Sequence, residues 1–117
     1  MPVVATASPS ASPGPSADAC CPPAVELDGT LDVERIAAVA RALADALRVR
    51  ILDVLRRSDV PVCQCELIAL FEIRQSLLSH HMRRLVDAGL VDVERRHRWA
   101  YYSVSPGAAK ELTAWLS

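Results

Sequence analysis

The sequence lacks the long apolar runs and the special motifs that mark several large classes of protein. No apolar stretch approaches the roughly 20 residues that a membrane-spanning helix needs. The chain does not begin with basic residues followed by an apolar run of about 7–15 residues, which excludes a secretory signal. A Cys-x-x-Cys motif, a βαβ pattern and a Gly-rich phosphate loop are also missing, so a thiol reductase or a nucleotide-dependent enzyme is not indicated. We therefore expect a cytoplasmic protein that is not an enzyme and has no membrane partner.

The chain as a whole has no excess of charge of one sign, but one segment does. The formal net charge of the 117 residues is −1. Residues 1–73 contain six Arg and ten acidic residues, whereas residues 74–98 contain six Arg and three acidic residues. The arginines of this second segment are Arg74, Arg83, Arg84, Arg95, Arg96 and Arg98. Such a local concentration is typical of phosphate binding to nucleic acid, although a solvated protein face is the ordinary alternative.

The distribution of proline divides the chain into two parts. Six of the eight prolines fall within residues 1–24, between Ser and Ala. This composition predicts a flexible leader over residues 1–30, which carries Cys20-Cys21, and a single folded domain over residues 31–117. Because the core of so short a domain is small, we expect the protein to dimerise.

Apolar residues recur at helical spacing from Leu31 to Leu47, and Asp28 or Thr30 could cap the start of this helix. A second helix is predicted over about residues 47–57. A short helix over residues 64–71, a turn at 72–74 and a longer helix over 75–88 follow, and Gly89 would end the last of these. This arrangement predicts a helix-turn-helix.

After Gly89 the period changes from helical to alternating. Residues 91–94 and 99–104 are predicted to form two strands joined by a basic hairpin tip at 95–98. Pro106 could start a final helix that carries an apolar stripe of Leu112, Trp115 and Leu116. The order of elements predicts an α+β fold, mainly α: a winged helix-turn-helix whose wing is the β-hairpin.

The polar residues of the longer helix are placed for contacts with double-stranded DNA. Four of them lie in the N-terminal half, which in such folds enters the major groove: Gln75, Ser76, Ser79 and His80. Arg83 and Arg84 lie one turn further on and are expected to bind phosphates, together with the wing arginines. A metal site at His80-His81 is disfavoured because adjacent helical residues point about 100° apart. A Ser79–His80 hydrolase pair is disfavoured for the same reason.

The four cysteines form two pairs, Cys20-Cys21 in the leader and Cys63-Gln64-Cys65 before the helix-turn-helix. In a cytoplasmic protein such thiols are expected to be ligands or redox groups rather than disulfides. Because Cys63 and Cys65 lie at a helix N-terminus, both are expected to ionise more readily than free cysteine. All four thiolates could hold one soft metal ion, within one subunit or between two. Alternatives are a thiol-redox sensor and four cysteines without a joint role.

Several motifs resemble those of the ArsR–SmtB family of metal-sensing repressors. They are Ala-Leu-Ala-Asp-Ala-Leu-Arg-Val-Arg-Ile-Leu at 42–52, Cys-Gln-Cys-Glu-Leu at 63–67, Gln-Ser-Leu-Leu-Ser-His-His-Met at 75–82 and Leu-Val-Asp-Ala-Gly-Leu-Val at 85–91. The likeness covers about residues 31–117. It implies a homodimer, formed through the first and last helices, that binds operator DNA and releases it when a metal ion binds.

The resemblance also bears on the effector. Adjacent cysteines such as Cys20-Cys21 resemble those of arsenite-responsive members, which use three thiolates, so trivalent arsenic or antimony is favoured. Cadmium- and lead-responsive members use four thiolates, including a Cys-x-Cys like Cys63 and Cys65, and this remains the alternative. Residues 105–117 contain no His, so the zinc or nickel site of the family is not expected.

The chain departs from the family pattern in the helix-turn-helix. Glu72 stands where members usually have Gly in the turn, and Arg74 stands where they have a capping Ser. A turn of different shape is therefore a possibility, and Arg74 could instead add a phosphate contact.

Overall fold

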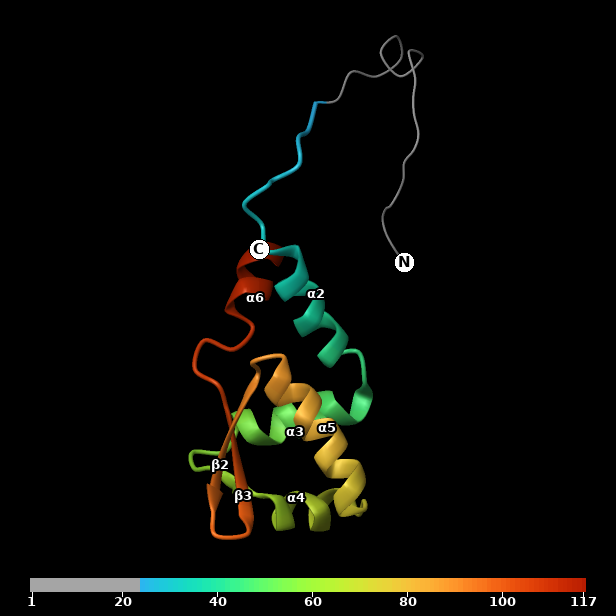
Figure 1. Cartoon of the computed structure of the whole chain (residues 1–117), viewed down its shortest axis with the longest axis vertical. Helices are drawn as coiled ribbons and strands as arrows, with labels where there is room; N and C mark the ends of the chain where they lie inside the picture. The colour runs from blue at the N-terminus through green and yellow to red at the C-terminus, as the bar shows by residue number, and fades with distance from the viewer. Residues whose placement is uncertain (1–23) are drawn as a thin grey trace. The chain divides into compact units, whose positions relative to one another are not determined.

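The computed structural model describes residues 24–117, which fall into two units, residues 24–31 and residues 32–117. In the first unit Asp28 accepts hydrogen bonds from the N–H and the hydroxyl of Thr30. The second unit contains every helix and strand discussed below (Figure 1). In order they are α2 (Val33–Ala42), α3 (Ala46–Arg56), β1 (Val62–Cys63), α4 (Gln64–Phe71), α5 (Gln75–Asp87), β2 (Val91–Arg96), β3 (Trp99–Val104) and α6 (Lys110–Leu116). None of the helices in residues 24–117 is long and apolar enough to cross a membrane.

Two aspartates set where the first two helices begin. Asp32 is the N-cap of α2 and accepts the N–H of Arg35 at 3.1 Å, so the expectation that Asp28 or Thr30 caps this helix is wrong. Asp45 is the N-cap of α3 and accepts two backbone N–H groups. The apolar spacing predicted one helix as far as Leu47. The structure instead has two helices, because Asp45 starts a new one. Its side chain accepts backbone N–H groups that have no hydrogen-bond partner within the first turn of a helix.

The three-stranded sheet has the order β1-β3-β2, and both pairings are antiparallel. The hairpin β2–β3 runs in register from Val91 opposite Val104 to Arg96 opposite Trp99. Strand β1 was not expected from the sequence, because two residues are too few to show an alternating pattern. It pairs with the middle of β3, with Val62 opposite Tyr102 and Cys63 opposite Tyr101.

The helix-turn-helix lies where it was predicted, with α5 ending one residue earlier, at Asp87. Its turn keeps a left-handed residue although glycine is absent. Glu72 has φ 52° and ψ 48°. A residue with a Cβ in this conformation costs about 1 kcal/mol or more relative to glycine. Arg74 is the N-cap of α5 and makes no side-chain cap hydrogen bond. The turn is therefore formed without a glycine at its left-handed position and without a capping side chain at the start of α5.

Gly89 ends α5 as predicted. It adopts a φ of 78°. The N–H of Leu90 donates to the carbonyl of Leu85 at 3.0 Å, and the N–H of Gly89 donates to the carbonyl of Val86. This pair of bonds is a Schellman motif, for which a left-handed glycine is favoured.

Helix α6 begins later than expected. Pro106 lies in a turn rather than at the first helical position, and Ala109, with φ 61°, precedes the helix. Helices α2 and α6 lie against each other at the end of the unit remote from α4, and an ion pair joins Arg35 to Glu111 (Figure 1). Of the apolar stripe predicted on α6, Leu112 packs against the core, but Trp115 and Leu116 are 53% and 67% exposed.

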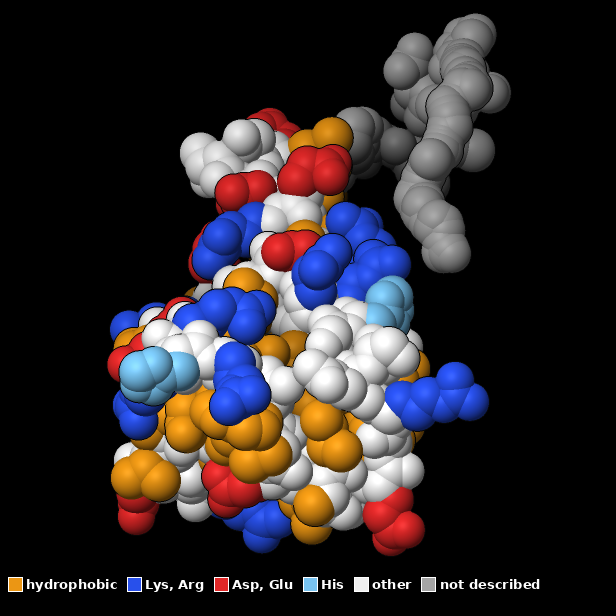
Figure 2. Space-filling model, turned by 60° about the horizontal axis from the view of Figure 1, so that its bottom comes forward, with side chains coloured by type: hydrophobic (Ala, Val, Ile, Leu, Met, Phe, Trp, Pro, Cys, Tyr) orange, Lys and Arg blue, Asp and Glu red, His pale blue; other side chains and the backbone are white. Residues whose placement is uncertain are grey.

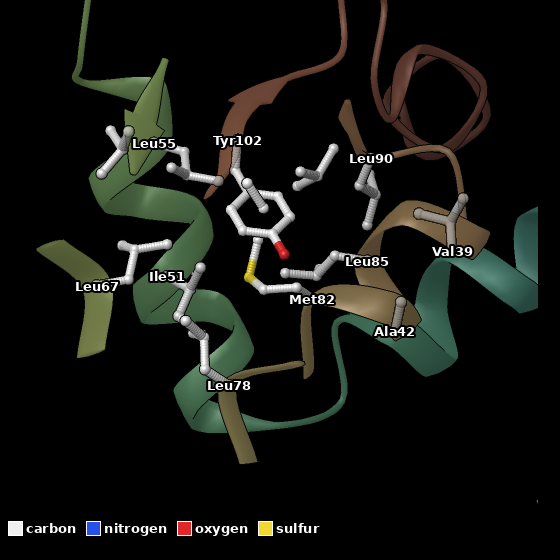
Figure 3. Packing of buried hydrophobic residues seen from close by; sticks show 13 residues of the cluster. Val39, Ala42, Ile51, Leu55, Leu67, Leu78, Met82, Leu85, Leu90 and Tyr102 are labelled. Atoms are coloured by element: carbon white, nitrogen blue, oxygen red, sulfur yellow. The ribbon is translucent and has the colours of Figure 1, made fainter. Parts of the chain in front are cut away.

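A single apolar core joins the helices to the sheet (Figure 3). Its members are Val39, Ala42, Ile51, Leu55, Val62, Leu67, Leu78, Met82, Leu85, Leu90, Val91, Ala100 and Tyr102. Met82 from α5 and Tyr102 from β3 meet near its centre (Figure 3). Because α5 contributes three of these side chains and β3 two, the longer helix and the wing are held against the same core.

Candidate nucleic-acid interface and thiol pair

Helix α5 has one buried face and one exposed polar face. Leu78, His81, Met82 and Leu85 are buried. Most of the side chains that the sequence assigned to DNA contacts lie on the exposed face: Gln75, Ser76, Ser79, His80, Arg83 and Arg84. The spacing of the buried residues, near three and four, fixes which side faces outward. The structure therefore presents the predicted DNA-contacting residues to solvent.

An open groove of about 460 Å³ runs between α5 and the wing. From α5 it is lined by Gln75, Ser79 and Arg83, and from the wing by Arg95 and Arg98. Figure 2 shows several basic side chains spread over one face of the molecule. Two polar groups suited to bases and three guanidinium groups suited to phosphates thus line one groove.

The wing arginines differ in their surroundings, which the sequence did not predict. Strand β2 extends to Arg96, so Arg95 and Arg96 belong to the strand and only His97 and Arg98 form the turn. This corrects the expected hairpin tip at 95–98. Because successive strand residues point to opposite faces, Arg95 faces the groove and Arg96 faces away from it.

Arg96 is engaged by neighbours of the wing. Its guanidinium lies 3.0 Å from a Glu94 carboxylate oxygen and 4.6 Å from the centre of the Tyr101 ring. The hydrogen bond from Arg96 lowers the pKa of Glu94. Arg98 makes a looser contact, with its guanidinium carbon 6.0 Å from the centre of the Trp99 ring. Arg96 is therefore less available for phosphate than Arg95 or Arg98.

The remaining predicted contacts lie outside the groove. Arg74, Ser76 and His80 line a shallow surface at the N-terminal end of α5, next to the turn. Arg84 faces the opposite side, toward α2 and α3. Ser76 and His80 also line a shallow hollow with Ser79 and Arg83, so this surface continues into the groove, whereas Arg84 faces another side of α5.

Cys63 and Cys65 form a close pair at the start of α4. Cys63 is the buried N-cap of the helix, Cys65 is exposed, and their sulfur atoms are 2.9 Å apart. The backbone N–H of Cys63 donates to a Glu66 carboxylate oxygen at 3.0 Å. The pair therefore has one sulfur anchored in the fold and one facing solvent.

The expectation that both thiols ionise more readily than free cysteine is wrong for Cys65. The pKa of Cys65 is raised, mainly because its thiol donates a hydrogen bond to the Cys63 sulfur, and desolvation and nearby negative charge add to this effect. Losing the proton would remove that bond. The effect of the neighbouring sulfur on the pKa of Cys65 is therefore larger than the opposing effect of the helix N-terminus.

Two sulfurs alone do not complete a metal site. Within residues 24–117 no three side chains of His, Cys, Asp or Glu are grouped so as to hold an ion. The other two predicted ligands, Cys20 and Cys21, lie outside the residues that the structure describes.

The adjacent histidines are separated by the fold. His80 is exposed, whereas His81 is buried and its Nδ1 lies 3.1 Å from an Arg48 guanidinium nitrogen. Burial lowers the pKa of His81 most, and the positive charge of Arg48 adds to the effect. The same Arg48 donates to the carbonyl of Ala42 at 2.7 Å. Sequence analysis missed this link between α2, α3 and α5, because only the folded chain brings residues 42, 48 and 81 together.

Comparisons with known proteins agree with this geometry. The model of the family "bacterial regulatory protein, arsR family" matches residues 45–93, from the cap of α3 into β2. The chain is 38% identical over 66 residues to an arsenical resistance operon repressor of Bacillus subtilis, which covers 56% of this chain and 61% of that protein. It is 33% identical over 90 residues to the putative arsenical resistance operon repressor ArsR2 of Halobacterium salinarum, covering 74% and 72%. The chain belongs to the ArsR family.

A solved structure supports the same assignment. NolR from Sinorhizobium fredii is 29% identical, with a TM-score of 0.59 over 74% of this chain and 84% of that one. The predicted ArsR family and the mainly helical winged helix-turn-helix are both confirmed. Members of the ArsR family are DNA-binding regulators of transcription, and the expectation that this chain is not an enzyme agrees with that.

Proposed function

We propose that this ArsR-family protein is a repressor that binds operator DNA and releases it when a soft metal ion binds its cysteine thiolates. The observation that carries the proposal is the sulfur pair, 2.9 Å apart, at the start of the first helix of the helix-turn-helix. Soft thiolate ligands favour soft ions over Mg²⁺ or Ca²⁺. The relatives named as arsenical resistance repressors support trivalent arsenic or antimony, with cadmium or lead as the alternative.

The position of the pair suggests how ligation would reach the DNA-binding surface. Cys63 pairs with Tyr101 in the middle of the wing strand β3, and Cys65 lies on α4, which packs against α5. A metal ion that drew these sulfurs toward other thiolates would pull on both elements that line the groove.

Cys20 and Cys21 are the proposed source of the additional thiolates. Binding of arsenic as the uncharged hydroxide would use three thiolates, and binding of Cd²⁺ or Pb²⁺ would use four. We also propose that two chains form a dimer through α2 and α6. On these helices Val33, Trp115 and Leu116 are each more than half exposed in the single chain.

The test is a titration of the reduced full chain, bound to promoter DNA, with arsenite and separately with Cd²⁺, followed by fluorescence anisotropy. Cys65→Ser is the sharper variant because Cys65 is exposed, whereas Cys63 is buried and caps α4. We expect Cys65→Ser to bind DNA as the wild type does and to lose release by metal. Comparison with Cys20→Ser and Cys21→Ser distinguishes three ligands from four.

If the Cys65→Ser variant fails to bind DNA in the absence of metal, the thiol is structural and the proposal is wrong. A thiol-redox sensor is the second candidate, since two sulfurs at this distance are open to oxidation as well as to ligation. Release by peroxide or polysulfide, together with no response to arsenite or Cd²⁺, would favour that candidate.

A further inference from the structure

A second basic site lies on the side of α5 that faces away from the wing. It is a pocket of about 200 Å³ at the junction of three helices. Its walls are Ala38, Arg41 and Ala42 from α2, Arg48 from α3, and Arg84, Asp87 and Ala88 from the end of α5. We call it the α2–α3–α5 pocket. None of the three arginines lines the groove between α5 and the wing.

The charges of the α2–α3–α5 pocket do not balance. Three guanidinium groups face one carboxylate, that of Asp87, which leaves a net charge of +2. In the part of the chain that the structure describes, the ion pairs involve Arg35, Arg56, Arg57 and Arg96, and neither Arg41 nor Arg84 belongs to one. The Asp45 carboxylate also acts electrostatically on Arg48 but does not line the pocket, and an anion between the three arginines would reduce the repulsion that remains between their charges.

One of the three guanidinium groups is held in place before any ligand arrives. Arg48 donates from Nε to the Ala42 carbonyl at 2.7 Å, and its Nη1 lies 3.1 Å from Nδ1 of His81. These contacts fix the plane of the guanidinium and use only part of its five donors. A fixed guanidinium loses little side-chain entropy when it binds an oxyanion in bidentate fashion.

The other walls leave room for a small ligand. Ala38, Ala42 and Ala88 present only methyl groups, so the space between the arginines is not filled by larger side chains. Arg41 and Arg84 are exposed and can therefore turn toward a ligand without disturbing the core.

We propose that the α2–α3–α5 pocket binds a phosphate-type oxyanion through Arg41, Arg48 and Arg84. The anion is either a backbone phosphate of the operator or a free phosphate ion, since both present the same oxygens to a guanidinium. An anion held there would join α2, a helix of the proposed dimer interface, to α5, the helix that presents the DNA-contacting side chains. The operator source rests on the proposed function, whereas the free-ion source does not.

The first arm of the test uses the DNA-free full chain and inorganic phosphate. Phosphate is titrated against chloride at constant ionic strength, and binding is followed by NMR shifts of the backbone amides around the pocket. We expect saturable binding that weakens about tenfold in Arg41→Gln and Arg84→Gln and tightens in Asp87→Asn. Arg50→Gln is the matched control, because Arg50 is an exposed arginine of α3 outside the pocket.

The second arm measures the salt dependence of operator binding by anisotropy. If a backbone phosphate fills the pocket, Arg41→Gln lowers the slope of log K against log salt by about one, and Arg50→Gln leaves it unchanged. Saturable phosphate binding together with an unchanged slope would identify the free ion as the ligand.

The pocket proposal is overturned if phosphate binds no better than chloride and Arg41→Gln matches Arg50→Gln on the operator. The two proposals fail separately. Loss of operator binding in Arg95→Gln without loss in Arg41→Gln would support the DNA groove alone. A wild-type chain that binds no promoter DNA would refute the proposed function, and the phosphate titration would still decide the pocket.

Discussion

Glu72 shows how one residue can hold a turn that its side chain does not favour. Its left-handed backbone is compatible with glycine at no steric cost, but a Cβ makes it unfavourable. The turn keeps this conformation because Leu67 before it and Leu78 after it are both buried in the core. Tertiary packing therefore outweighs a local preference at this position.

We predict that Glu72→Gly stabilises the protein by about 0.5–1 kcal/mol. The substitution relieves the backbone strain of the folded state, and the greater conformational freedom of glycine in the unfolded chain offsets part of this gain. Urea denaturation measures the difference in the free energy of unfolding. Glu72→Ala is the control, since it removes the same charge and keeps the Cβ. An equal gain in both variants would attribute the effect to charge instead.

His81 predicts a dependence of stability on pH. Burial holds its pKa in the folded state below that in the unfolded state, which is about 6.5. The unfolded state therefore binds the proton more readily, and the folded state loses stability as the pH falls through and below that value.

We expect His81→Gln, whose side-chain oxygen can still accept from Arg48, to flatten the profile between about pH 7 and 5. The measurement is the urea midpoint at each pH. His80→Gln serves as the control because His80 is exposed. A profile that flattens in the His80 variant and not in the His81 variant would contradict the assignment.

At the scale of elements, the wing is a strand pair with two chemically different faces. Arg95 lines the groove beside α5, whereas Arg96 is paired with Glu94 and stacked on Tyr101. We predict that Arg95→Gln and Arg98→Gln each lower the salt slope of operator binding by about one, and that Arg96→Gln changes it less. Anisotropy titrations over a range of salt concentrations measure the slopes, and three equal slopes would show that the faces do not differ.

The thiol pair predicts different pH dependences for the two classes of effector. Since the pKa of Cys65 is raised, its thiol is protonated at neutral pH and must lose a proton when a metal cation binds. Affinity for Cd²⁺ should therefore rise with pH. Arsenic that binds as the uncharged hydroxide releases one water for each thiol, so the thiol proton leaves with the hydroxide and the affinity should change little.

Isothermal titration in two buffers of different ionisation enthalpy counts the protons released per ion. Release of protons with Cd²⁺ and none with arsenite is the expected outcome. Cys65→Ser should release fewer protons with Cd²⁺ than the wild type does. Equal proton release for the two effectors would contradict the proposed chemistry.

At the scale of the whole molecule, the proposed dimer rests on apolar side chains that the single chain leaves uncovered. We predict that Trp115→Ser weakens dimerisation by roughly tenfold or more, since large aromatic residues often dominate interface energies. Sedimentation equilibrium gives the dissociation constant. Trp99→Ser is the matched control, because Trp99 is 43% exposed but lies on the wing. A wild-type chain that remains monomeric would refute the dimer.

Much of the fold followed from the sequence because its signals are local. The boundaries of α4, the start of α5 and the whole of β3 agree with the predicted ranges, since apolar residues at helical spacing specify the helices and aromatic and β-branched residues specify the strand. The features that were missed depend on contacts between distant residues. Strand β1 exists only through its pairing with β3, and the Arg48–His81 bond spans 33 positions of sequence.

The candidate site divides in the same way. Exposure of the polar face of α5 could be predicted from periodicity. The different environments of Arg95 and Arg96 could not, because they depend on how far β2 extends. The raised pKa of Cys65 depends on a distance between two sulfurs, which the spacing of cysteines in a sequence does not give.

Gln64, the residue between the two thiols, is also attached to the wing. Its side-chain oxygen accepts the backbone N–H of Ala100 at 3.2 Å, at the position where β1 has ended and β3 continues. The glutamine side chain thus extends the ladder by one rung beyond the two-residue strand. Any movement of Cys63 or Cys65 that displaces Gln64 would break this hydrogen bond and expose the Ala100 amide. The rate of deuterium uptake at that amide would therefore report whether a movement of the cysteines reaches the wing.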